Sequence, residues 1–186
     1  MVISTFTSLT ACHGLVALPE FHVVEDFNPD AQIDITFWAK NENNRTQQEV
    51  YRNAVQDFEK LYPNINVTLK LYSDYNEIYK DVLKNIRTQT TPNICITYPD
   101  HIATYLSGAD TVVPLDDLFV DKKYGLGGSE VRFDGPAVNE IVEQFREECK
   151  FNGYYYAIPY MRSTEACYIN KTYVEKLGFE IPEDLT

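Results

Sequence analysis

The hydrophobic residues of the first half of the chain change their spacing in a regular way. Apolar and polar side chains alternate over residues 33–38 and again over 65–71, which is typical of β-strands. Between these segments, and again over 78–86, apolar residues recur at the three- and four-residue spacing of an amphipathic helix. A short apolar run at 93–98 indicates a buried parallel strand. The resulting β-α-β-α-β-α order predicts an α/β fold with a mostly parallel sheet flanked by helices.

Short polar residues mark where the predicted helices begin. Asn43 or Asn44 is expected to cap the first helix, and Ser73 or Asp74 the second, because their side chains accept hydrogen bonds from free backbone N–H groups. We expect Asp100 to cap a short third helix in the same way. The inward face of the first helix is predicted from the apolar positions Val50, Ala54, Phe58 and Leu61.

The second half of the chain has a less regular pattern. Pro136 fits the first turn of a helix that continues to Cys149. Residues 154–159 and 166–170 are predicted to be strands, and the second of these leads into a helix that ends at Gly178.

The composition argues against several classes of function. The formal net charge is −12, with 28 acidic residues against 16 lysines and arginines, and no basic stripe is present to bind nucleic acid. The three histidines are scattered and the four cysteines lack CxxC spacing, so we expect no metal and no cofactor. The glycines at 125–128 lack the spacing of a phosphate-binding loop. Pairing among Cys95, Cys149 and Cys167 stays open.

The first twelve residues resemble the export signal of a bacterial lipoprotein. Residues 1–11 are uncharged and weakly apolar, and Leu9-Thr10-Ala11 precedes Cys12 as in a lipobox, whose cysteine is lipidated. The resemblance implies a signal-peptide remnant at 1–11 and a lipid anchor on Cys12. Because a basic n-region is missing, we expect the true N-terminus upstream. Residues 12–32 contain prolines and acids without a period, and we expect them to form a linker.

Physical chemistry also predicts where a ligand would bind. In open α/β sheets ligands bind at the carboxyl ends of the strands, which here lie near residues 38–43, 73–75 and 98–100. Each of these segments offers an aromatic ring and a polar group, and such a combination suits the apolar faces and hydroxyl rim of a pyranose. Trp38 and Tyr98 could equally be core residues, and the sequence leaves both readings open.

Several segments together resemble extracellular solute-binding proteins of family 1. They are Ile35–Trp38, Phe58–Val67, Thr91–Ile94, Tyr98–Asp100, Val113–Asp117 and, most specifically, Gly153–Gly178. The resemblance implies a periplasmic-binding-protein-like (type II) fold, in which two α/β lobes close on a ligand. It makes 33–157 an incomplete N-terminal lobe and 158–186 the crossover and start of the second lobe. Two lobes need roughly 300–400 residues, so we expect a truncated chain that binds ligand weakly or not at all by itself.

The resemblance also implies a function and a set of ligand-binding residues. These residues are Trp38, Asn41, Glu42, Tyr98, Asp100, Tyr160, Ser163 and Thr164. The implied protein is a monomeric, non-enzymatic receptor that captures an oligosaccharide or polyol phosphate, such as a maltose-type sugar or glycerol 3-phosphate. It delivers this ligand to the permease of an ABC importer, at the extracellular face of the bacterial membrane. Two alternatives stay open, namely a secreted glycosidase with a carboxylate pair and a ligand-sensing subunit of a membrane receptor.

Overall fold

A parallel three-stranded sheet lies at the centre of the fold. The computed structural model describes residues 22–41, 44–108, 111–163 and 165–181. In this part of the chain, the sheet has the order β2-β1-β3 and comprises β1 (Ile33–Lys40), β2 (Ile65–Tyr72) and β3 (Ile94–Cys95). β1 pairs with β2 along its whole length, from Ile33 opposite Ile65 to Lys40 opposite Tyr72. The predicted α/β class with a parallel sheet is confirmed.

β3 is shorter and more open than the strand predicted at 93–98. It pairs with β1 only at Ile94 and Cys95, and Ile94 is 52% exposed. The side chain of Asn93 extends the contact, because its Oδ1 accepts a 2.9 Å hydrogen bond from the backbone N–H of Thr36. The prediction of a fully buried strand was wrong, since β3 is at the edge of the described sheet.

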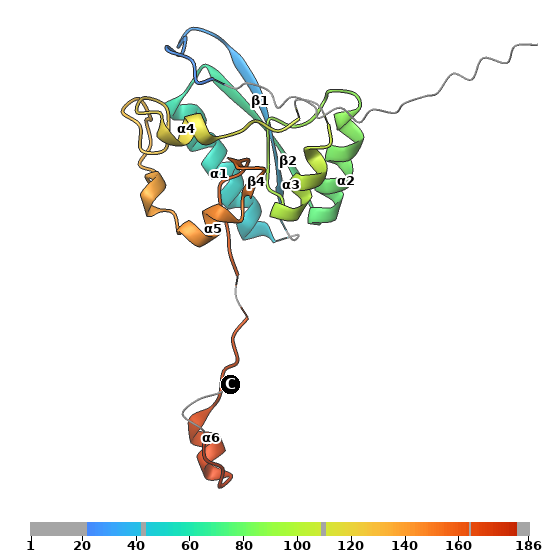
Figure 1. Cartoon of the computed structure of the whole chain (residues 1–186), viewed down its shortest axis with the longest axis vertical. Helices are drawn as coiled ribbons and strands as arrows, with labels where there is room; N and C mark the ends of the chain where they lie inside the picture. The colour runs from blue at the N-terminus through green and yellow to red at the C-terminus, as the bar shows by residue number, and fades with distance from the viewer. Residues whose placement is uncertain (1–21, 42–43, 109–110, 164, 182–186) are drawn as a thin grey trace, which may run out of the picture.

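Helices cover both faces of the sheet (Figure 1). α1 (Arg45–Leu61) packs on one face, where the ring of Tyr51 meets that of Phe37 edge-on at 6.0 Å. α2 (Tyr75–Ile86) and α3 (Pro99–Tyr105) pack on the other face. The buried core between them and the sheet consists of Trp38, Tyr72, Ile78, Val82 and Tyr105.

The inward face of α1 lies one position away from the predicted one. Val50 is 54% exposed, whereas Tyr51 is only 4% exposed. The helix therefore rotates so that the large ring of Tyr51, and not the smaller Val50 and Ala54, faces the sheet. An aromatic ring buries more apolar area than either, which favours this rotation.

The caps of α1 and α2 are as predicted, but that of α3 is not. Asn44 accepts hydrogen bonds from the backbone of the first turn of α1, and Asp74 accepts one from Asn76 N–H at the start of α2. α3 begins at Pro99, directly after Tyr98, so Asp100 lies inside the first turn instead of capping it. Proline is favoured at a first helical position because it needs no N–H partner, and this moves the helix start forward.

The long helix predicted from Pro136 to Cys149 was wrong. The structure has a 3-10 turn at Val138–Glu140 and a separate short helix, α5 (Glu143–Glu147). Ile141 and Val142 between them have ψ angles of 127° and 118°, which no helix accommodates. Both residues are β-branched, and branching at Cβ disfavours helical backbone.

A tight hairpin follows α5. β4 (Lys150–Phe151) and β5 (Tyr154–Tyr155) pair antiparallel, so the strand predicted at 154–159 is shorter than expected. The turn residues Asn152 and Gly153 both have positive φ, 51° and 91°, as a two-residue hairpin turn requires. The Asn-Gly pair is the sequence signal for this hairpin.

The ends of the described chain differ in how they contact the part of the molecule built around the parallel sheet and the β4–β5 hairpin, which we call the lobe. Residues 25–31 of the predicted linker pack on it, since the N–H of Phe27 donates to the Tyr124 hydroxyl at 2.8 Å and Asn64 donates to the carbonyl of Ala31 at 2.9 Å. Residues 1–11 and Cys12 lie outside the described residues. The C-terminal segment leaves the lobe and contains α6 (Lys171–Lys176), which stands apart from it (Figure 1).

Two further predictions concern this C-terminal part. Residues 166–170, all of them described, form no strand, so that prediction was wrong. Gly178 follows α6 with φ +81°, the left-handed conformation of a helix C-terminus, as predicted.

None of the helices in the described part of the chain has the length and apolar character that crossing a bilayer requires. The three described cysteines, Cys95, Cys149 and Cys167, are free thiols.

Candidate functional site

The carboxyl ends of the three parallel strands meet at one edge of the sheet, which we call the strand-end edge. β1 ends at Lys40, β2 leads through Ser73 and Asp74 into α2, and β3 leads through Thr97 and Tyr98 into α3. In Figure 1 the C-terminal segment leaves the lobe on this side. This edge is where open α/β sheets bind ligands.

Two tyrosines form an aromatic platform at the strand-end edge. The ring centroids of Tyr75 and Tyr98 lie 4.7 Å apart with an interplanar angle of 54°. Tyr98 is 50% exposed, so part of its ring faces solvent. The Nζ atom of Lys40 lies 4.7 Å from the centroid of Tyr75, which places a positive charge beside the platform. An exposed ring next to a charge and backbone polar groups can both stack against a ligand and hydrogen-bond to it.

A layer of rings behind the platform fixes the position of Tyr98. His101 meets Tyr98 edge-on at 5.4 Å and lies 4.4 Å from the ring of Tyr79. Thr97 Oγ1 lies 3.1 Å from His101 Nδ1 and 3.2 Å from the hydroxyl of Tyr105. Burial raises the pKa of Tyr105 to about 12, so its phenol stays neutral and keeps this contact. The platform therefore rests on a packed support.

Tyr51 and Tyr160 approach the strand-end edge from the α1 side. Their ring centroids lie 6.5 Å apart, and Tyr160 is 57% exposed. Burial raises the pKa of Tyr51, and the phenols of Tyr160 and Tyr75 raise it further. The Tyr51 phenol therefore stays neutral.

The predicted site residues have different environments. Trp38 is only 8% exposed and lies in the core. Asn41 is 7% exposed, and its backbone joins β1 to α1: its N–H donates to the Tyr72 carbonyl at 3.0 Å and its carbonyl accepts from Asn44 N–H at 2.8 Å. Tyr98 is on the platform.

The remaining predicted site residues lie at or beyond the edge. Asp100 is exposed in the first turn of α3, and Tyr160 lies beside Tyr51. Ser163 is exposed in the segment that leaves the lobe. Glu42 and Thr164 lie outside the described residues.

Three residues of the strand-end edge, Lys40, Tyr75 and Tyr51, are not among the site residues predicted from the sequence. Tyr75 falls within a strand-end segment, and the rule that points to Tyr98 could have selected it. Lys40 is the last residue of β1. It lies two residues beyond the alternating segment 33–38 from which this strand was predicted. Tyr51 has no local signal, because its place at the edge depends on the rotation of α1.

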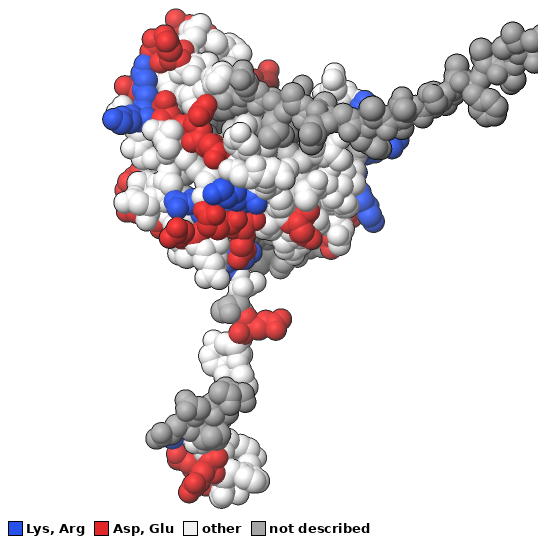
Figure 2. Space-filling view, viewed as in Figure 1, with Lys and Arg blue, Asp and Glu red and all other residues white. Residues whose placement is uncertain are grey.

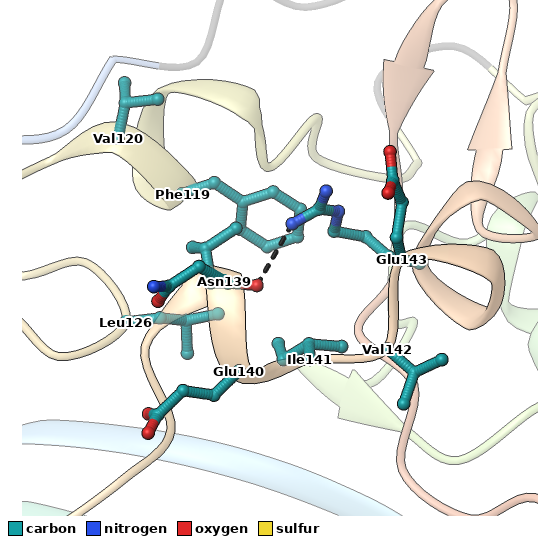
Figure 3. Close-up of a pocket in the computed structure, with 10 residues that line it drawn as sticks. Phe119, Val120, Leu126, Asn139, Glu140, Ile141, Val142 and Glu143 are labelled. Atoms are coloured by element: carbon teal, nitrogen blue, oxygen red, sulfur yellow. Dashed lines mark hydrogen bonds between the residues drawn. The ribbon is translucent and has the colours of Figure 1, made fainter.

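A hollow of about 760 Å³ lies away from the strand-end edge, between α4 (Asp116–Val120) and α5. Figure 3 shows apolar side chains in its lining together with Asn139, Glu140 and Glu143. Arg146, which also lines it, donates to the carbonyl of Val138 at 3.0 Å. None of its lining residues belongs to the strand-end edge. On the face seen in Figure 2, lysines and arginines occur beside acidic residues. The described residues contain no group of three or more His, Cys, Asp or Glu side chains placed to hold a metal ion.

Comparison with known proteins decides the family. The sequence profile described as "Bacterial extracellular solute-binding protein" matches residues 42–185, which is well over half of the chain. The chain belongs to this family. The resemblance identified from the sequence is therefore confirmed, and the members of this family are binding proteins that act outside the cell. No curated protein matches the chain.

Solved structures of solute-binding proteins share the fold. One is an extracellular solute-binding protein of family 1 from Alicyclobacillus acidocaldarius, with a TM-score of 0.53, 19% identity, and coverage of 69% of this chain and 28% of that one. Another is the GacH receptor of Streptomyces glaucescens, solved unliganded and in complex with acarbose, with a TM-score of 0.52, 20% identity, and coverage of 81% and 34%. The chain thus spans about a third or less of the length of these solute-binding proteins.

Proposed function

We propose that this chain is part of a receptor that captures a carbohydrate outside the cell, and that the strand-end edge is its share of the binding site. The observation that carries the proposal is the platform of Tyr75 and Tyr98, a half-exposed aromatic surface at the carboxyl ends of parallel strands. The apolar face of a pyranose stacks on such a surface, while its hydroxyls bond to polar groups at the rim. The binding of acarbose by GacH, a relative in fold, supports a carbohydrate ligand.

The rim around the platform supplies both hydrogen-bond donors and hydrogen-bond acceptors. Asp100 offers an exposed carboxylate at the start of α3, and Lys40 offers an ammonium group. Asn41 lies at the end of β1, and Tyr160 brings a phenol from the segment that leaves the lobe. Glu42, Ser163 and Thr164 complete the proposed set of ligand contacts, with Trp38 supporting the platform from the core.

We extend the proposal to the organisation of the chain. Residues 33–157 form part of the N-terminal lobe, and 158–186 cross into a second lobe. The exposure of Tyr168, Tyr173 and Phe179 supports this division, because such large apolar side chains normally pack within a lobe. Closure of two lobes on a ligand would present a new surface to the permease of an ABC importer.

The receptor is proposed to be a monomer held at the membrane by a lipid on Cys12. The support is the Leu9-Thr10-Ala11-Cys12 sequence. Mass spectrometry of the native protein extracted from membranes tests this anchor. A lipid-modified Cys12 peptide is expected, and an unmodified peptide would reject the anchor.

Ligand binding is tested by saturation-transfer NMR with mannotriose, maltotriose, acarbose and glycerol 3-phosphate, each added separately. Because one side of a cleft buries little of a ligand, we expect saturation transfer to at least one of the sugars with roughly millimolar affinity. Tyr98→Ala should weaken this binding about tenfold, as expected when a central aromatic contact is truncated. Tyr168→Ala is the matched control, since Tyr168 is 93% exposed and lies in the segment that leaves the lobe.

The outcomes separate the proposal from its alternatives. Absence of saturation transfer for every sugar would contradict a carbohydrate site on the strand-end edge of this chain, and transfer for glycerol 3-phosphate alone would favour a polyol phosphate. Release of shorter sugars during the measurement would identify a glycosidase. A ligand-sensing subunit would bind the sugar equally well, and co-purification with a membrane receptor in place of a permease would identify it.

A further inference from the structure

Tyr51 carries a buried hydroxyl without a hydrogen-bond partner. Its side chain is 4% exposed, and its Oη has no partner in hydrogen-bond geometry among the described residues. Buried hydroxyls in folded proteins are nearly always paired, because an unpaired one has lost its bonds to water without replacement. An orphaned hydroxyl of this kind is suited to a partner that arrives from outside.

The hydroxyl lies among the phenols of the strand-end edge. The ring of Tyr51 is held edge-on by Phe37 at 6.0 Å. After burial, the phenols of Tyr160 and Tyr75 raise the pKa of Tyr51, while the neighbouring side chain of Gln47 lowers it. Tyr160 is thus near, with ring centroids 6.5 Å apart, although the two hydroxyls do not reach hydrogen-bond geometry.

We propose that Tyr51 is a specificity-determining residue of the carbohydrate site, whose hydroxyl bonds to a hydroxyl group of the ligand. The inference rests on the proposed function. The ring of Tyr160 lies beside that of Tyr51 and is 57% exposed, so an outward rotation of the Tyr160 side chain would admit the ligand. A phenol both donates and accepts, so it suits a sugar hydroxyl, whereas a deoxy sugar would leave it unpaired.

NMR of the full chain labelled with ¹³C at Cζ of tyrosine tests the contact directly, with maltotriose and mannotriose as probes. The Cζ resonance reports on hydrogen bonding of each phenol. We expect the Tyr51 and Tyr160 signals to shift together with those of Tyr75 and Tyr98. Shifts at Tyr75 and Tyr98 without one at Tyr51 would overturn this inference and leave the proposed function standing. No shift at any tyrosine would overturn both.

A pair of phenylalanine variants separates a binding role from a structural one. Tyr51→Phe keeps the ring against Phe37 and removes only the orphaned hydroxyl, so it should weaken sugar binding about fivefold without lowering the Tm. Tyr156→Phe is the control, because Tyr156 is 5% exposed and has an orphaned hydroxyl too, but near Tyr154 and Asp116. It should leave affinity unchanged. Unchanged affinity in Tyr51→Phe, or a lowered Tm there, would overturn the proposal.

Discussion

The Nζ atom of Lys70 lies 4.5 Å from the centroid of the Trp38 ring. The two residues are opposite each other in the register of β1 and β2, and Lys70 lies at the same distance from the ring of Tyr72. Its aliphatic stem and ammonium group thus cover ring surface that would otherwise face water. This contact explains why Trp38, although close to the end of a strand, is a core residue.

Trp38 is the only tryptophan of the chain, so its fluorescence reports on this contact. Lys70→Ala should increase quenching of Trp38 by acrylamide and lower the free energy of unfolding by about 0.5–1 kcal/mol, because a cation–π contact and its apolar cover are lost. Lys60→Ala is the control, since Lys60 pairs with Asp57 in an exposed position and should change neither quantity measurably. Equal quenching in both variants would show that Lys70 does not shield the indole.

Asp81 should give the chain an acid-dependent component of stability. Hydrogen bonds from Lys70 at 3.0 Å and from the Tyr72 hydroxyl at 2.8 Å lower the pKa of Asp81 below its usual value of 3.8. A lowered folded-state pKa contributes stability above pH 3.8, and this contribution is lost as the pH falls through the folded-state pKa. Lys70 and Asp81 are both more than a third exposed, so the contribution is at most about 1 kcal/mol.

Asp81→Asn tests this component by urea unfolding at several pH values. The variant should be less stable than the wild type by up to about 1 kcal/mol at pH 7, and the difference should shrink in acid below pH 3.8. Asp57→Asn, in an exposed pair, should show a smaller difference at pH 7. A stability difference for Asp81→Asn that persists unchanged into strong acid would contradict the assignment.

Gly153→Ala should destabilise the hairpin of β4 and β5. A Cβ atom at Gly153 would meet nothing within 4 Å, so the cost arises from its φ of +91° and should be about 1–2 kcal/mol in thermal unfolding. Gly178→Ala places the same change in an equally open left-handed position, but after α6 and away from the lobe. It should leave unfolding of the lobe unchanged, and equal effects of the two variants would show that the hairpin is not part of the cooperative unit.

The fold between residues 33 and 108 could be predicted because its signals are local. Alternation identified β1 and β2, and the side chains of Asn44 and Asp74 fixed the helix starts. The α5 region could not be predicted in this way, because apolar residues at helical spacing also occur where Ile141 and Val142 adopt extended backbone. The spacing of apolar residues alone therefore does not show where two β-branched residues interrupt a helix.

The candidate site could be predicted only where one strand end determines it. Tyr98 follows β3 directly, and the strand-end rule locates it. The approach of Tyr51 and Tyr160 joins two segments that are distant in sequence, and it depends on how α1 rotates to bury the Tyr51 ring. That rotation depends on how the helix packs on the sheet, and the spacing of apolar residues does not predict it.

Mapping of backbone amide shifts in a titration of the ¹⁵N-labelled chain with maltotriose and mannotriose tests the central claim most directly. A carbohydrate site at the strand-end edge predicts shifts at the amides of residues 73–75 and 97–101 and at Lys40, saturating together. The hollow between α4 and α5, around Val138 and Arg146, should stay unchanged. Shifts confined to that hollow, or no shifts with either sugar, would contradict the assignment of the strand-end edge as a carbohydrate-binding surface.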